Sequence, residues 1–173
     1  MKYADHDHVL ISDGVIGLRP IEVADAAAHL AAQDRESVRR TAGPGTPNTV
    51  AEFERCAAEW AAGGPRKTFA VVAVSSHALA GTLDVMLEPD FLAKRQADIR
   101  YGIHAPWRDN GVPGRTIVLA CRYLARNDLA DEAMLRIDRD NKSEIALAHQ
   151  LGFHYHRSSI DSEGYLDWFL QAL

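Results

Sequence analysis

Apolar residues along this chain follow two spacings, which divide it into short elements. Alternating or continuous apolar runs of about four to eight residues predict strands, whereas apolar residues about three to four positions apart predict helices. Strands are predicted at 15–19, 68–74, 79–87, 97–103, 133–138, 153–158 and 165–170. Helices are predicted at 23–32, 49–62, 117–125 and 142–151. Strands and helices mixed along one chain in this way are typical of an α/β domain.

Capping residues mark the ends of two of these helices. Thr49 with Glu52, and Asn141 with Glu144, have the spacing of a capping box. In that motif the first side chain accepts a backbone N–H from the later residue, and the acidic side chain reaches back to the N–H of the first. Gly152 stands where a glycine in the left-handed conformation ends a helix. These signals fix where the two helices should begin and where the second should end.

The size and composition of the chain suit one domain. Its 173 residues, of which 47% are hydrophobic, are enough for a substantial core. No repeat, low-complexity tract or interdomain linker interrupts the predicted elements. We therefore expect residues 1–173 to form a single domain.

A glycine-bearing loop at 107–116 joins the predicted strand 97–103 to the predicted helix 117–125. Backbone N–H groups exposed at the start of a helix bind phosphate without a dedicated lysine. The loop fits neither a P-loop nor a dinucleotide-binding fingerprint, because the glycine spacing is wrong and no lysine follows. Two interpretations remain open at this point, a nucleotide-like ligand and an ordinary turn before a helix.

Two motifs resemble those of the GNAT family of N-acetyltransferases. Arg108, Gly111 and Pro113 match its Arg/Gln-x-x-Gly-x-Gly/Ala loop, with proline in place of the last small residue. About thirty residues later, Asn141 and the run 151–153 (Leu-Gly-Phe) match its second half. The segment 17–26 is similar to the opening strand and helix of the branch that includes the ribosomal-protein and aminoglycoside acetyltransferases.

The resemblance implies a fold and a cosubstrate. The fold would be a single mixed, mostly antiparallel sheet flanked by helices, of the acyl-CoA N-acyltransferase type. Acetyl-coenzyme A would bind where the strand before the loop splays from its neighbour, and the N–H near Ile103 would face the thioester oxygen. The residues implied in cosubstrate binding are Ile103, His104, Arg108, Asn110, Gly111, Val112, Pro113, Gly114, Arg115 and Asn141.

The implied reaction moves an acetyl group to a primary amine of a small molecule, a peptide N-terminus or a protein. Asp98 stands where related enzymes often carry a glutamate, so it is the candidate base; the alternative is a solvated carboxylate or a partner for Arg100. The leaving thiolate is protonated by Ser143 or by water, or it leaves without a proton from any residue. A different class of function stays open: a non-catalytic acyl-coenzyme A sensor or regulatory module.

Charge and composition exclude several partners. The net charge is −5, and no basic cluster covers a predicted face, so we expect neither nucleic acid nor a membrane surface as partner. The two cysteines fit neither a disulfide framework nor a metal site, and we expect no metal. No signal segment or membrane span is found, which predicts a cytoplasmic protein, monomeric or homodimeric. The amine-selecting segments are expected at 41–47 and 87–96.

Overall fold

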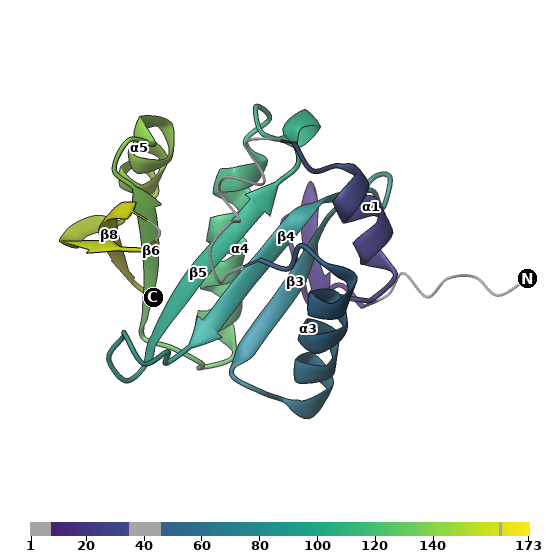
Figure 1. Ribbon diagram of the computed structural model, residues 1–173, viewed down its shortest axis with the longest axis horizontal. Coiled ribbons are helices and arrows are strands. Elements are labelled where there is room, and N and C mark those ends of the chain that lie inside the picture. The colour runs from purple at the N-terminus through teal and green to yellow at the C-terminus, as the bar shows by residue number, and fades with distance from the viewer. Residues whose placement is uncertain (1–7, 35–45, 163) are drawn as a thin grey trace, which may run out of the picture.

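Eight strands form one sheet in the computed structural model, which describes residues 8–34, 46–162 and 164–173 (Figure 1). Their spatial order is β1-β2-β3-β4-β5-β6-β8-β7. Every neighbouring pair is antiparallel except β5 and β6, which are parallel. This confirms the expected mixed, mostly antiparallel sheet. The strands are β1 (Ile11–Ser12), β2 (Ile16–Pro20), β3 (Arg66–Ala73), β4 (Leu79–Leu87), β5 (Gln96–Ile103), β6 (Glu132–Asp138), β7 (His154–Asp161) and β8 (Gly164–Ala172).

Helices cover both faces of the sheet. Figure 1 shows α1 (Asp25–Ala31) and α3 (Val50–Ala62) in front of it and α4 (Val112–Arg126) behind it. α3 packs on β3, α1 on β4, and α4 on β2 and β5, while α5 (Lys142–Gln150) packs on β6. A short 3₁₀ turn, Ala105–Trp107, joins β5 to the loop before α4. Helices on both faces explain why the middle strands are buried on both sides.

The two faces of the sheet have different cores. Behind it, Phe69, Leu83 and Ile99 pack with the apolar stripe of α4 and are almost fully buried. In front, a smaller cluster joins α1 and α3 to β3 through Phe53 and Ala70. The front face beyond this cluster carries polar and charged side chains, so it is the face on which chemistry is possible.

An ion pair fixes the first helix to the second strand. Arg19 on β2 donates from two nitrogens to the carboxylate of Asp25 on α1, at 2.9 and 2.7 Å. Asp25 also accepts the backbone N–H of Glu22 at 2.8 Å. The opening motif at 17–26 therefore has a structural role, because it sets where α1 lies over the sheet.

Each predicted capping box forms one of its two expected hydrogen bonds. The side chain of Asn141 accepts the N–H of Glu144 at 3.3 Å, and Thr49 accepts that of Glu52 at 3.2 Å. The returning bonds differ from the capping box. The Glu144 carboxylate accepts from the side-chain amide of Asn141 at 2.7 Å, because the backbone N–H of Asn141 already donates to the carbonyl of Asp138. Glu52 likewise reaches Asn48 instead of Thr49.

The helix after the glycine loop begins earlier than its apolar pattern indicates. α4 starts at Val112, five residues before the predicted run 117–125. Gly111 is its N-cap in the left-handed conformation, with φ of 74°, and Pro113 lies in the first turn, where proline is favoured. The loop and the helix start are therefore one structure, and glycine and proline define its boundary.

Candidate active site

The sheet opens between its two parallel strands. Only Gln96–Asp98 of β5 pair with Glu132–Met134 of β6, and pairing ends there. Figure 1 shows the two strands close at their lower ends and apart at their upper ends. The carbonyl of Gln96 and the N–H of His104 bond toward the β4 side, at 3.0 and 2.8 Å. Because backbone groups alternate along a strand, the N–H of Ile103 faces the opening.

The first turn of α4 supplies backbone N–H donors for the candidate site. The first bond of the helix runs from the Arg115 N–H to the Gly111 carbonyl at 3.1 Å. The N–H groups of Val112 and Gly114 have no acceptor within the helix, since the first turn of any helix lacks one, and Pro113 has no N–H. The helix start can therefore donate to an anion from two of its first three residues.

The two glycines of this loop are required for different reasons. A side chain at Gly111 would meet nothing within 4 Å, but φ of 74° strains any other residue. Gly114 has an ordinary backbone, yet a Cβ there would lie 3.3 Å from Leu147 Cδ1 on α5. Gly111 thus shapes the loop, whereas Gly114 lets α5 approach the start of α4.

The two arginines expected at the cosubstrate bind protein groups in this structure. Arg108 donates to the Ile103 carbonyl at 2.9 Å and, with two nitrogens, to the Asp34 carboxylate at 2.8 and 2.9 Å. Arg115 donates to Asp13 at 2.8 Å. Arg108 therefore joins the end of β5 to the segment after α1. The roles of the two arginines toward a pyrophosphate stay predictions.

The backbone of His104 is also occupied. Its N–H donates to the Ala80 carbonyl at 2.8 Å, and its carbonyl accepts the N–H of Trp107 at 2.9 Å. Both backbone groups of His104 therefore have a partner within the protein, and its role toward the cosubstrate stays a prediction. Its imidazole is buried instead, on the front face of the sheet.

Asp98, the candidate base, is buried in an ion pair. Both carboxylate oxygens accept from Arg136 on β6, each at 2.9 Å, and Arg100 lies 3.6 Å away. Asp98 is only 4% exposed. This arrangement favours a partner for arginine over a solvated carboxylate, although the main partner is Arg136 and not Arg100. The role of Asp98 as a base stays a prediction.

A second buried pair lies on the neighbouring strands. Asp84 on β4 accepts from Arg66 at 3.0 and 2.9 Å and from the hydroxyl of Thr68. Burial raises the pKa of the Asp84 carboxyl, and Arg66 opposes that rise. Register places Asp84 opposite Arg100 of β5, on the same face as Asp98. The front of the sheet thus carries a row of paired charges.

Asn141 and Ser143 lie together at the start of α5. The Asn141 carbonyl oxygen accepts both the Glu144 N–H and the Ser143 hydroxyl, the latter at 3.1 Å. Ser143 therefore directs its proton at Asn141. Both side chains are used in capping this helix, and their roles toward a cosubstrate stay predictions.

Sequence reasoning missed one residue, His29 on α1. Its Nδ1 lies 2.9 Å from Nε2 of His104, and only 2% of the residue is exposed. Burial and the neighbouring His104 lower the pKa of His29 to about 4. The available signal was a histidine on the buried side of a short helix, one turn after Asp25 and Ala26.

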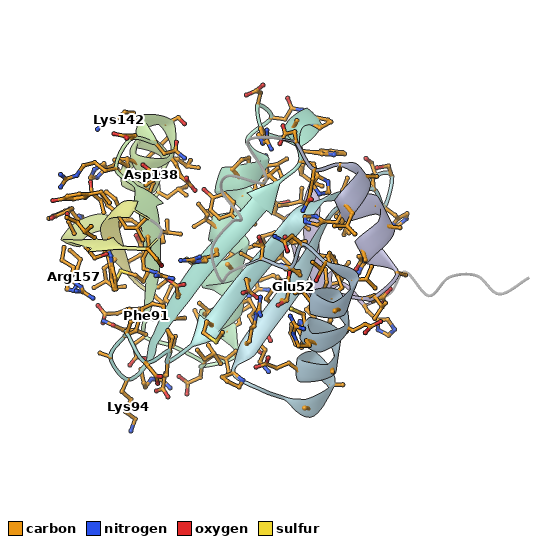
Figure 2. The ribbon with its side chains drawn as sticks, viewed as in Figure 1. Glu52, Phe91, Lys94, Asp138, Lys142 and Arg157 are labelled. Carbon is orange, nitrogen blue, oxygen red and sulfur yellow. The ribbon has the colours of Figure 1, made fainter. Side chains whose placement is uncertain are left out.

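The amine-selecting segments are partly described. Residues 41–45 lie outside the described residues, while Thr46 is buried. In the other segment, Figure 2 shows Phe91 near the lower end of β6. The guanidinium carbon of Arg136 lies 4.1 Å from the centre of the Phe91 ring. Phe91 is 43% exposed, so it forms a border of the charged row. No helix in the described part of the chain is long and apolar enough to span a bilayer.

Comparison with known proteins gives one family and many structures. The sequence profile of the acetyltransferase (GNAT) domain matches residues 16–154. Among curated proteins, none matches the sequence.

Three solved structures illustrate the likeness. A Salmonella typhimurium acetyltransferase that modifies the N-terminal serine of a 50S ribosomal subunit protein is 14% identical, with 95% of this chain and 98% of that chain covered and a TM-score of 0.72. Mycobacterium smegmatis RimJ in complex with CoA-disulfide is 17% identical, with 92% and 82% covered and a TM-score of 0.72. The self-immunity acetyltransferase MccE, in complex with acetyl-CoA and AMP, is 13% identical, with 94% of each chain covered and a TM-score of 0.75.

Proposed function

The chain belongs to the GNAT family of acetyltransferases, and from that premise we propose how its residues carry out the reaction. It is an acetyl-coenzyme A-dependent N-acetyltransferase, which moves an acetyl group to an amine by direct attack. The residues that hold the cosubstrate and the identity of the amine are our proposals. We also propose that residues 1–173 act as one N-acetyltransferase domain.

The opening between β5 and β6 is the main support for the proposed position of the cosubstrate. It leaves the Ile103 N–H directed away from β4, and the segment after β5 leads directly to the start of α4, where Val112 and Gly114 supply two backbone donors. Pyrophosphate suits such a helix start, because backbone donors and the helix dipole both favour an anion. The described residues therefore fit acetyl-coenzyme A, with its pyrophosphate at the 110–114 loop and its arm along β5.

The chain's own groups then have separate tasks. The α4 donors hold the anionic end, while the Ile103 N–H donates to the thioester carbonyl oxygen as negative charge develops on it. The binding energy of the remote end fixes the thioester beside the front face, where an amine can approach. Arg108 supports this arrangement indirectly, because it holds the Ile103 carbonyl and Asp34 together.

We propose a primary amine at a peptide N-terminus as the first acceptor to examine. Two observations support this choice. The related Salmonella structure is of an enzyme that modifies an N-terminal serine. The front face of the sheet in this chain carries paired charges, which suit a polar chain more than an apolar one. The test is a panel of serine- and alanine-initiated peptides and small primary amines, read by release of free coenzyme A.

Two matched glycine variants test the cosubstrate site. Gly111→Ala and Gly63→Ala both place a methyl group on a left-handed residue with open space around it, at φ of 74° and 68°. Each should lose about 1 kcal/mol of stability. Only Gly111→Ala should weaken acetyl-coenzyme A binding, by about tenfold or more, because the loop amides then lose their geometry.

Isothermal titration calorimetry with acetyl-coenzyme A measures the difference, and circular dichroism shows that both variants fold. Equal affinities in Gly111→Ala and Gly63→Ala would place the pyrophosphate elsewhere. The loop would then be an ordinary turn before a helix.

A further inference from the structure

Buried polar atoms without hydrogen-bond partners gather under α1. Such atoms cost about 1–3 kcal/mol each, so several in one place indicate a site that a ligand completes. Among the described residues five side chains have one. Four of the five lie around the front of the sheet at α1: His29 Nε2, Gln33 Nε2, Thr46 Oγ1 and Thr82 Oγ1.

Three separate segments bring these atoms together. His29 lies in the last turn of α1, and Gln33 follows just beyond the end of this helix. α1 packs on β4, the strand of Thr82. Thr46 precedes Pro47, whose backbone acts on His29. Register places Thr82 opposite Gly102 of β5, two residues before His104. The unmet polar groups therefore lie beside the end of β5, where the thioester is proposed to be.

The two imidazoles form a directed chain. Nδ1 of His104 lies 3.2 Å from the Leu79 carbonyl, which can only accept a hydrogen bond. A neutral His104 therefore carries its proton on Nδ1, and its Nε2 accepts from His29 Nδ1 at 2.9 Å. The remaining nitrogen, His29 Nε2, then carries the lone pair. It is buried and makes no hydrogen bond of ordinary geometry among the described residues, although the Pro47 carbonyl also acts on this ring.

We propose that His29 Nε2 accepts the proton that the substrate ammonium loses before it attacks the thioester, with His104 as the positioning residue. The inference rests on the proposed function. His104 holds the His29 ring in place by accepting its Nδ1 proton. Asp98 is then free to neutralise Arg136.

The protons and electrons balance. One proton passes from the ammonium nitrogen to His29 Nε2, and the nitrogen lone pair forms a bond to the acetyl carbon. The carbon–sulfur bond breaks, and its electron pair leaves with sulfur. The second proton leaves the nitrogen as the amide forms and goes to the thiolate. His29 finally releases its proton to solvent.

The surroundings keep the pair uncharged until an amine arrives. His29 is opposed as a cation by burial and by His104, and favoured by Asp25 and the Pro47 carbonyl, with a resulting pKa of about 4. Burial also lowers the pKa of His104, where Leu79 and Asp34 favour the charge and Arg108 opposes it. From α3 the Phe53 ring faces His29, with 5.4 Å between the ring centroids. Burial lowers the pKa of an entering ammonium as well, so the ammonium is a stronger acid in this site than in water.

The decisive variant is His29→Asn. Asparagine keeps a donor near the position of Nδ1, so the bond to His104 is retained while the Nε2 lone pair is removed. His104→Asn keeps the donor to Leu79 and removes the acceptor for His29. His156→Asn, on the exposed part of β7, is the matched control.

Turnover is measured with acetyl-coenzyme A and the best acceptor of the panel, beginning with a serine-initiated peptide. At about pH 6.5, His29→Asn should lower kcat by about 100-fold or more, with unchanged acetyl-coenzyme A affinity. The deficit should shrink by about tenfold or more at about pH 9.5, since N-terminal amines with pKa of about 7.7–8.0 are then uncharged. His104→Asn should lower kcat by about tenfold with the same pH trend, and His156→Asn should not change it.

The possible outcomes distinguish a failure of the proposed His29 role from a failure of the proposed acetyltransferase function. A deficit of equal size at every pH, or no deficit, overturns the proton-accepting role of His29 and leaves the acetyltransferase function intact. Wild-type protein that fails to bind acetyl-coenzyme A, or to acetylate any amine of the panel, overturns the proposed function itself. Circular dichroism verifies folding, and His29→Gln replaces His29→Asn if the shorter side chain prevents it.

Discussion

Asp98 shows how much the role of one carboxylate depends on a partner far along the chain. Its two oxygens bind Arg136, whose side chain is 9% exposed and also lies over the rings of Phe91 and Trp168. Breaking a buried pair from one side leaves the other charge without compensation. Asp98 therefore has a large structural task whether or not it meets an amine.

Asp98→Asn should lower the free energy of unfolding by about 3 kcal/mol, because the buried Arg136 keeps its charge and loses its counterion. Urea denaturation measures this change. Asp128→Asn makes the same substitution in an exposed pair with Arg95 and should leave stability nearly unchanged. An Asp98→Asn protein of normal stability with strongly reduced turnover near neutral pH would return Asp98 to the role of base.

His29 predicts a dependence of stability on acid. With its folded pKa at about 4 and an ordinary value of 6.5, the unfolded chain takes up a proton between these pH values and the folded protein does not. Stability should therefore fall as the pH falls through this window, by about 2 kcal/mol from this residue at pH 5. His29→Asn should lose less stability between pH 7 and pH 5 than the wild type, as measured by urea denaturation. Identical losses would place the pKa of His29 near its ordinary value.

At the scale of single elements, local signals predicted most of the structure. Strands such as β4 and β5 agree with their apolar runs within about one residue, because alternation and flanking turns are local properties. The two-residue strand β1 was not predicted, since it is too short to show alternation. The start of α4 was predicted late, since its first turn has glycine and proline in place of an apolar stripe.

The candidate site was harder to predict, because it depends on contacts between distant residues. Asp98 and Arg136 are 38 residues apart, Arg108 and Asp34 are 74, and His29 and His104 are 75. No periodicity records which side chains meet across the sheet. The glycine loop was recognisable from the chain alone, whereas the partners that occupy Arg108 and Asp98 were not.

The cap of α5 gives a test at this scale. Asn141→Ala should lower the free energy of unfolding by about 1 kcal/mol, because the Glu144 N–H and the Ser143 hydroxyl lose their acceptor. Asn141→Asp retains an acceptor and should keep most of the stability. Thermal denaturation compares the two variants. A stable Asn141→Ala protein with poor acetyl-coenzyme A affinity would show instead that this asparagine contacts the cosubstrate.

At the scale of the whole molecule, the sheet consists of two parts joined by a short parallel pairing. One part runs from β1 to β5, and the other contains β6, β8 and β7. Residues Gln96–Asp98 and Glu132–Met134 are the sheet's connection between them. A molecule bound in the opening would contact both parts, so its binding should stabilise the strands on both sides.

Acetyl-coenzyme A should slow amide hydrogen exchange on both sides of the opening, at 100–103 in β5 and 135–138 in β6. It should also raise the melting temperature, since at about 100 times its Kd a ligand of the native state adds about 2.7 kcal/mol. Exchange in the pairing of β2 with β3, away from the opening, should change less. Slower exchange on one side alone would show that the cosubstrate does not lie between the strands.

The parting of β5 and β6 also bears on what other chains can join this sheet. Proteins usually keep strand edges at the periphery and guard them with charges, prolines or covering loops. Here two edges face one another in the interior of the sheet, and an extended peptide adds to such an edge by main-chain hydrogen bonds that are largely independent of its sequence. We expect the apoprotein to admit short extended peptides at this place by β-augmentation. Occupancy by acetyl-coenzyme A would then also protect the protein against strand invasion.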